Sequence, residues 1–340
     1  MAATLNHIQL GRDAYKGAAT TLCAGCGHNS ITNHLIKALY ELGVEPHRLA
    51  KMSGIGCSSK TPAYFVEQAH GFNGVHGRMP ALTTGAQLAD RRLIMLGVSG
   101  DGDTVSIGLG QFMHMVRRNV DCTYIIEDNG TYGLTKGQFS ATADRGSKNK
   151  RGLMNNDNAI DLVAIALQLG ASFVARSFSG DKTQLVPLIA AAIQHKGAAF
   201  IDVISPCVAF NNHVGSTKSF DYVREHNDAV NRLDVITGRD PITVDYAPGS
   251  VQVVEQHDGT KLALRKIDAD YEAHDRVAAM TFLQKHAAKG QIVTGLLYVD
   301  PESEDLHAHL DTVDTPLNAL GESALCPGSA ALDKINASLR

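Results

Sequence analysis

Two polar residues, Asp101 and Asn129, each come shortly after an apolar run of the chain. The runs, residues 93–98 and 123–126, predict buried strands. Because the carboxyl ends of parallel strands meet at one edge of a sheet, we expect the two side chains to lie close together. A carboxylate and an amide oxygen are hard ligands, and they suit a magnesium ion that holds a diphosphate. The pair therefore predicts a site for a diphosphate-bearing cofactor.

The glycines around Asp101 fit a phosphate-binding turn but not a familiar nucleotide fingerprint. A G-x-G-x-x-G motif from Gly100 would need glycine where Val105 stands, and the chain has no G-x-x-x-x-G-K-S/T. Gly102 lets the backbone approach phosphate oxygens, and the following helix N-terminus adds partial positive charge. A backbone carbonyl near Thr131 would be a third magnesium ligand. The alternative is a tight strand-to-helix turn followed by an ordinary Asx turn. The placement of the asparagine after the next strand disfavours it.

A C-x-x-C motif is formed by Cys23 and Cys26. Such a motif is typical of a zinc half-site, a redox pair or part of an iron–sulfur site. A thioredoxin-like pair would need a preceding strand, which residues 17–22 do not indicate, and no second C-x-x-C completes a zinc ribbon. Cys57 in a glycine-rich loop and Cys207 after a proline offer two more thiolates. Four thiolates from three distant segments favour an iron–sulfur cluster. Cys122 is expected in the core, and Cys326 has no neighbour that would pair with it.

The elements that must position these residues alternate between strands and helices. Near-continuous apolar strands separated by helices predict an α/β fold with a mostly parallel sheet covered on both faces. The four segments that carry Cys57, Asp101, Asn129 and Cys207 each follow a predicted strand. We therefore expect these segments to lie at one edge of the sheet. Strands are expected at 49–52, 93–98, 123–126, 173–176 and 198–204, and helices at 28–43, 105–116, 159–169 and 182–195.

The composition changes beyond about residue 235. Residues 237–241 and 247–250 are rich in turn formers, and 267–290 hold one candidate helix. Residues 299–340 are mostly polar, which predicts an arm that packs on the core or on a partner; a partly disordered tail is the alternative. We therefore predict a domain over 1–235 that carries both sites, and a C-terminal extension over 236–340.

Charge and hydropathy narrow the classes of function. At 340 residues, 44% hydrophobic and a net charge of −4, the chain is typical of a globular protein without a broad nucleic-acid-binding surface. No apolar run is long enough to cross a membrane, and residues 1–17 lack the core of a signal peptide. A cytoplasmic location is expected. In that compartment six cysteines are not a disulfide framework.

The stretch 100–138 resembles the GDG…N motif of the thiamine-diphosphate fold. The resemblance implies that Asp101, Asn129 and the backbone carbonyl of Thr131 hold Mg²⁺. It also implies that four residues contact the diphosphate of the cofactor: Gly102, Asp103, Gly133 and Leu134.

Together with the cysteines, this motif resembles the β subunit of the 2-oxoacid:ferredoxin oxidoreductases. The resemblance covers roughly residues 17–230 and implies the PP-type module of the thiamine-diphosphate-binding fold. Cys23, Cys26, Cys57 and Cys207 would carry one [4Fe–4S] cluster. The thiamine would be lined by Ile55, Gly56, Cys57, Ser58 and His76. The motifs that carry the resemblance are Cys23-Ala-Gly-Cys26-Gly-His28, Ser53-Gly-Ile-Gly-Cys57-Ser-Ser, His76-Gly-Arg78 and Gly133-Leu-Thr-Lys-Gly-Gln138.

The resemblance also implies an activity. Thiamine diphosphate attacks the 2-oxo group of a substrate, decarboxylation follows, the acyl group passes to coenzyme A, and the cluster passes electrons to ferredoxin. The glutamate that activates the cofactor is expected from a separate α subunit, so no catalytic residue is certain in this chain. We expect αβ pairs and no activity from the chain alone.

A 2-oxoglutarate substrate is predicted, because residues 135–138 and 212–219 resemble that branch of the family. The distal carboxylate needs a cation, and the candidates are Lys60, Arg78 and Lys136, with Leu134 shaping the pocket; each cation is otherwise a solvated surface charge. The alternatives are pyruvate or a broad 2-oxoacid range, a non-oxidative thiamine-dependent decarboxylase or lyase, and a zinc-stabilised binding protein without catalysis.

Overall fold

The computed structural model describes residues 4–149, 151–210, 239–326 and 328–339. Within these residues, nine strands form one sheet in the order β2-β1-β3-β4-β8-β7-β11-β10-β9. The first six in this order run parallel, β11 is antiparallel to β7, and β9 is antiparallel to β10. Their bounds are β1 (Leu49–Ser53), β2 (His70–Asn73), β3 (Ile94–Gly100), β4 (Cys122–Asp128), β7 (Phe173–Phe178), β8 (Ala198–Ile204), β9 (Val251–Glu255), β10 (Lys261–Lys266) and β11 (Gln291–Val299).

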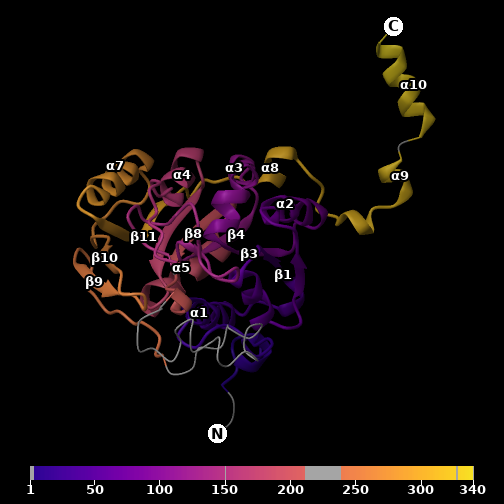
Figure 1. The fold of residues 1–340 in the computed structure, drawn as a ribbon. Coiled ribbons are helices and arrows are strands. Elements are labelled where there is room, and N and C mark those ends of the chain that lie inside the picture. The colour runs from indigo at the N-terminus through magenta and orange to yellow at the C-terminus, as the bar shows by residue number, and fades with distance from the viewer. Residues whose placement is uncertain (1–3, 150, 211–238, 327, 340) are drawn as a thin grey trace.

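Helices cover both faces of the sheet (Figure 1). One face carries α1 (Gly27–Leu42) and α5 (Lys182–Gln194), which pack on each other. The other face carries α2 (Met79–Ala89), α3 (Leu109–Arg117), α4 (Leu162–Leu169) and α7 (Arg276–Ala287). The predicted α/β fold with helices on both faces is confirmed.

The central strands are apolar on both sides, since each face is covered. On β3, Leu96 and Val98 point into the core beneath α1 and α5, whereas Met95 joins the core on the opposite face. On β4, Ile125 and Ile126 divide in the same way. Burying each such side chain contributes about 1.5–3 kcal/mol. This double burial explains why the strands lack the polar alternation of a half-exposed sheet.

The elements expected in the first two-thirds of the chain are present, with one change. The helix predicted from residue 105 is preceded by a π-helical turn, η4 (Gly102–Ile107), before α3 begins at Leu109. β2 and α2 were not expected. The backbone of β2 lies at the edge of the sheet with four exposed residues, so it carries no apolar signal.

The region beyond residue 235 contains three strands that the sequence did not predict. Residues 251–299 extend the sheet by three strands, with α7 packed on β11. β9 is mostly exposed, and Gly295 interrupts the apolar run of β11 at φ +132°, which weakened both strand signals. α8 (Leu306–Leu310) packs beside α2, whereas α9 (Glu322–Leu325) and α10 (Ser329–Ser338) project from the body and bury no residue (Figure 1). The predicted boundary at 235 lies outside the described residues.

The arrangement of the parallel strands decides where the chemistry lies. β1, β3, β4 and β8 are successive neighbours, and their carboxyl ends lie along one edge. The loop 54–57 follows β1, Asp101 follows β3, Asn129 follows β4 and Cys207 follows β8. The predicted convergence of these four segments is confirmed. None of the described helices combines the length and apolarity that a membrane span requires.

Candidate active site

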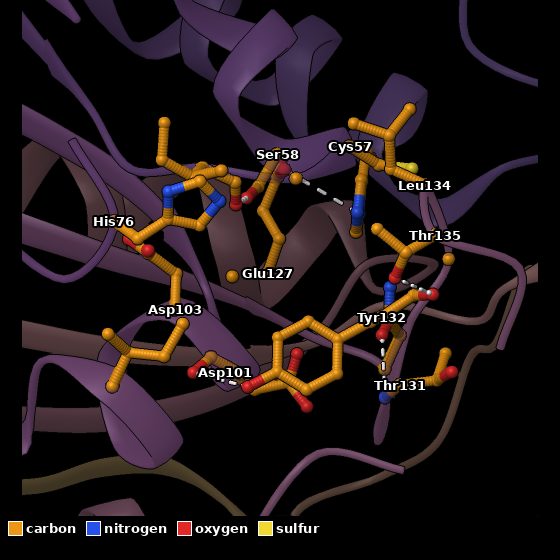
Figure 2. A pocket seen from close by; sticks show the side chains of 18 residues that line it. Cys57, Ser58, His76, Asp101, Asp103, Glu127, Thr131, Tyr132, Leu134 and Thr135 are labelled. Carbon is orange, nitrogen blue, oxygen red and sulfur yellow. Dashed lines mark hydrogen bonds and ion pairs between the residues drawn. The ribbon is translucent and has the colours of Figure 1, made fainter. Parts of the chain in front are cut away.

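A cavity opens at the carboxyl edge of the sheet, between the loops after β1, β3 and β4 (Figure 2). Every residue predicted to contact magnesium or thiamine diphosphate lines it. These residues are Ile55, Gly56, Cys57, Ser58, His76, Asp101, Gly102, Asp103, Asn129, Thr131, Gly133 and Leu134. His28, Gly100, Ile107, Glu127, Tyr132 and Thr135 complete the lining.

The Asp101 carboxylate lies at the inner wall of this cavity and is only 2% exposed. Its Oδ2 accepts hydrogen bonds from the hydroxyls of Ser140 and Thr142, the latter at 2.5 Å. Hydrogen bonds to a charged group contribute about 1.5–3 kcal/mol each, and they fix the carboxylate in one orientation. A buried, oriented carboxylate is the ligand that a divalent cation requires.

Asp128 is the last residue of β4, and Asn129 follows it directly. The Asn129 side-chain oxygen accepts from the backbone N–H of Thr131 at 3.0 Å, which forms an Asx turn. Asp128 Oδ1 accepts from Thr142 Oγ1 at 2.8 Å. Burial, with the negative charges of Asp101 and Asp202 nearby, raises the pKa of Asp128 well above its ordinary value. The upward shift follows from the same burial and the same neighbouring carboxylates that shape this edge of the cavity.

Gly102 allows a close approach that no other residue would. A Cβ atom at this position would lie 2.5 Å from a ring carbon of Tyr132. The Tyr132 hydroxyl donates to the Gly102 carbonyl at 3.1 Å, so the ring is held against the turn. Tyr132 was not among the predicted site residues, because its contact is with a residue 30 positions away.

The Asp103 carboxylate positions the loop that carries His76. It accepts from the backbone N–H of Gly77 at 2.7 Å and from the Ser99 hydroxyl at 3.0 Å. Gly77 has φ +69° and lies against the backbone of Gly108, which favours glycine there. Both carboxylate oxygens of Asp103 are thus used by the protein. A contact to a diphosphate from this residue would come from its backbone.

A second, smaller cavity is lined by all four cysteines predicted as cluster ligands, Cys23, Cys26, Cys57 and Cys207. It shares His28, Cys57, Asn129 and Gly133 with the first cavity. A Cβ atom on Gly133 would lie 3.5 Å from the sulfurs of both Cys57 and Cys207. Cys122 is buried in β4 as expected, and Cys326 is exposed at the end of α9.

Two buried titratable residues, His28 and Glu127, line the first cavity, and His28 also lines the second. Burial lowers the pKa of His28 to about 3 and raises the pKa of Glu127 well above its ordinary value. His28 Nδ1 is 3.6 Å from Glu127 Oε2, but the lowered pKa of His28 leaves the imidazole neutral at neutral pH, so the pair is not an ion pair. Neither residue had a predicted role. The one signal in the sequence is a carboxylate, Glu127, inside an otherwise buried strand.

The three cations proposed for substrate binding do not line the cavity. Arg78 and Lys136 are exposed, and Lys60 is partly buried in η3 (Cys57–Tyr64). Leu134 does line the cavity and remains 45% exposed at its mouth. The segment 212–219, which supported the substrate prediction, lies outside the described residues.

The donor atoms present fit the groups that the sequence predicts. A magnesium ion bound to a diphosphate would find one carboxylate, one amide oxygen and a turn without a side chain at Gly102. The four thiols surround one cavity, and the missing side chain of Gly133 leaves room beside two of them. In the described part of the chain, no three His, Cys, Asp or Glu side chains are grouped as a single-ion site. Burial, and then the negative charge of Cys207, raise the pKa of Cys26, so bound iron would have to displace a proton.

Comparison with known proteins places this geometry in a family. Residues 54–203 match the family described as thiamine pyrophosphate enzyme, C-terminal TPP binding domain. The chain is 38% identical over 263 residues to a 2-oxoacid:ferredoxin oxidoreductase β subunit from Sulfolobus sp, covering 77% of this chain and 81% of that one. It is 37% identical to the 2-oxoglutarate oxidoreductase subunit KorB of Mycobacterium tuberculosis, covering 76% and 68%.

A solved structure extends the likeness to the whole fold. The 2-oxoglutarate:ferredoxin oxidoreductase from Magnetococcus marinus, with 2-oxoglutarate, coenzyme A and succinyl-CoA bound, superposes with a TM-score of 0.72 at 29% identity. The match covers 97% of this chain and 96% of that one. The chain therefore belongs to the β subunits of the 2-oxoacid:ferredoxin oxidoreductases.

Proposed function

We propose that this chain is the β subunit of a 2-oxoglutarate:ferredoxin oxidoreductase. The complete enzyme converts 2-oxoglutarate and coenzyme A into succinyl-CoA and carbon dioxide, passes two electrons to ferredoxin, and is reversible. The observation that carries this proposal is the common wall of the two cavities, which includes Cys57 and Gly133. Sites for an electron-rich cofactor and for an electron acceptor are thereby adjacent.

The residues of the first cavity would hold thiamine diphosphate through magnesium. Asp101, the Asn129 side chain and the Thr131 carbonyl are the proposed ligands. When bound, thiamine diphosphate supplies a carbon nucleophile for the 2-oxo group and an acceptor for the electrons left by decarboxylation. The Gly102 turn brings backbone N–H groups toward the phosphates, and Asp103 holds the loop of His76 against the cavity. Placing these groups in advance reduces the reorganisation that the reaction would otherwise require.

The second cavity would hold one [4Fe–4S] cluster on Cys23, Cys26, Cys57 and Cys207. Its thiols come from three segments that the fold brings together around partly or fully buried positions. Thiolate ligands are the ordinary ligands of such clusters. Because the cysteine cavity borders the cofactor site, electrons would have a short path from the cofactor to the cluster.

The α subunit completes the proposed active site. The name of the family's β subunits implies an α partner. The cavity mouth is exposed at Leu134 and Thr135. We propose that the α subunit docks over this mouth, supplies the glutamate that activates the cofactor and excludes water. Catalysis by the β chain alone is not expected.

Two observations support the substrate assignment. Relatives are named for 2-oxoglutarate, and a lysine lies in the loop at the mouth of the cavity. Lys136 follows Leu134 in the loop at this mouth and has φ +76°. We propose that Lys60, Arg78 or Lys136 pairs with the distal carboxylate of 2-oxoglutarate once the α subunit is in place. Relatives named only for 2-oxoacids make a broader range the second candidate.

A substrate panel on the reconstituted αβ complex tests this proposal. Reduction of ferredoxin or viologen is measured with coenzyme A and each of 2-oxoglutarate, pyruvate and 2-oxobutyrate. We expect the highest kcat/KM for 2-oxoglutarate. Comparable values for all three acids would support the broad range. Carbon dioxide release without reduction of any acceptor would indicate a non-oxidative thiamine enzyme.

A further inference from the structure

His28 is the side chain whose position the proposed chemistry leaves unexplained. It is the second residue of α1, two positions after the helix N-cap Cys26, and it is 2% exposed. It lines both the cofactor cavity and the cysteine cavity. A buried imidazole is costly unless its ring nitrogens find partners, so its contacts indicate what it does.

The first contact joins the start of α1 to the loop that carries Cys207. His28 Nδ1 lies 2.6 Å from the Ser205 hydroxyl, and both side chains are buried. The backbone N–H of Gly27 donates to the Pro206 carbonyl at 3.1 Å. A Cβ atom on Gly27 would lie 2.5 Å from the Ser205 oxygen, so the two segments are in direct contact. Cys26 and Cys207 are therefore held by the same pair of segments.

The second contact reaches the segment that carries Cys57. Glu127 is fully buried beside His28, with 3.6 Å between Oε2 and Nδ1. Thr61 donates its hydroxyl to both Glu127 carboxyl oxygens at 3.0 Å. Thr61 belongs to η3, the helix that begins at Cys57. A separate hydrogen bond joins the C-x-x-C loop to α1, because the Asn29 amide donates to the Cys23 carbonyl at 2.9 Å.

We propose that the buried network of His28, Ser205, Glu127 and Thr61 is a positioning device that holds the three cysteine segments in one relative arrangement. These four side chains touch α1, the loop after β8, the end of β4 and η3. They also form part of the wall of the cofactor cavity, through His28 and Glu127. The network thus fixes the cluster ligands with respect to the cofactor site. This inference rests on the proposed cluster on the four cysteines.

A simple packing role would make a different prediction, and α1 provides a matched control. His34 lies on the same helix, is buried, and its Nε2 contacts the Ser179 carbonyl at 3.0 Å. It lines neither cavity. Loss of the His34 contact should lower stability alone, whereas loss of the His28 contact should also change the cluster.

The experiment compares Ser205→Ala, Ser205→Thr, Thr61→Val and His34→Gln in the αβ complex. The readouts are iron and acid-labile sulfide per β chain, the rate of iron loss to a chelator, the EPR line shape and midpoint potential of the reduced cluster, and Tm. Removing one buried hydrogen-bonding partner costs about 1–3 kcal/mol, which corresponds to about 5- to 150-fold in a rate or equilibrium. We expect Ser205→Ala to accelerate iron loss by about fivefold or more and to alter the EPR line shape.

The other variants separate the explanations. Ser205→Thr keeps a hydroxyl and should restore the wild-type spectrum, while His34→Gln should lower Tm and leave cluster content and line shape unchanged. Thr61→Val tests the network from its other end if Ser205→Ala does not fold. Iron loss and spectra that match wild type in both Ser205→Ala and Thr61→Val would overturn the inference. A wild-type complex that takes up no iron would instead overturn the proposed cluster, and the inference with it.

Discussion

The inner wall of the cofactor cavity and its mouth are built in opposite ways. At the inner wall, Asp101 is buried, and its carboxylate accepts hydrogen bonds from two hydroxyl groups. The neighbouring cysteine cavity has lining residues in common with the cofactor cavity. At the mouth, Leu134 and Lys136 are exposed, and Lys136 lies outside the cavity lining. Under the proposed function, the contrast teaches that the β fold would place the groups for the cofactor and the cluster in advance. The proposed substrate-binding groups would be positioned only in the assembled enzyme.

The largest effect is expected in the cysteine cavity, which adjoins the inner wall. Cys26→Ser removes a buried thiol of the cysteine cavity, so the αβ complex should lose its cluster and all reduction of ferredoxin. Iron and sulfide analysis measures this directly. Cys326→Ser, on the exposed arm, is the control and should retain full iron content. Equal iron in both variants would show that the cavity does not hold the cluster.

Asp101→Ala tests the inner wall of the cofactor cavity itself. Loss of even a residue that only orients a metal ligand lowers metal affinity about 10- to 100-fold, so loss of the carboxylate should cost at least about 100-fold in magnesium-dependent thiamine diphosphate affinity. Calorimetric titration of the αβ complex measures it. Cluster content should stay at the wild-type level, which separates the two cavities. Unchanged affinity would show that magnesium binds elsewhere.

Gly102→Ala tests the packing of the turn at the inner wall. A new Cβ would approach the Tyr132 ring to 2.5 Å, and overpacking of this kind costs about 1–3 kcal/mol in the free energy of unfolding. Chemical denaturation of the β chain measures the loss. Because the obstacle is the ring, the added cost of Gly102→Ala should nearly vanish in a Tyr132→Ala background. Additive effects of the two substitutions would contradict this account of the turn.

The smallest effect is expected at the mouth. If Lys136 pairs with the distal carboxylate, Lys136→Ala should raise the KM for 2-oxoglutarate about tenfold, because a hydrogen bond to a charged group contributes about 1.5 kcal/mol or more. Thiamine diphosphate affinity and iron content should not change. Lys289→Ala, an exposed lysine beyond α7, is the matched control. A KM that rises equally in both variants would mean a general charge effect.

The two regions also differ in how far the sequence predicts them. Asp101, Asn129, Cys57 and Cys207 each follow a strand, so the parallel topology alone brings them to one edge. The roles of Tyr132 and Glu127 were not predicted, because they depend on contacts with Gly102 and Thr61, which are distant in sequence. Residue patterns within a short stretch of sequence do not predict contacts between positions that are far apart in the chain.

The same limit applies to the C-terminal part of the fold. β9–β11 complete the sheet through pairing with β7, but β9 is mostly exposed and a glycine interrupts β11. The turn-rich composition around these strands gave no strand prediction, and one helix was the element expected there. Among the described residues of this C-terminal part, the segment with α9 and α10 projects from the body. A strand at the edge of a large sheet is specified mainly by its neighbour, and its own sequence gives a weak signal.

The most direct test of the account is EPR spectroscopy of the αβ complex mixed anaerobically with 2-oxoglutarate and no external acceptor. If the two cavities hold thiamine diphosphate and a [4Fe–4S] cluster side by side, a reduced-cluster signal should appear. That signal should be absent from the Asp101→Ala complex, which retains iron. A wild-type complex that contains iron, binds thiamine diphosphate and releases carbon dioxide, yet shows no reduced cluster, would contradict the central claim.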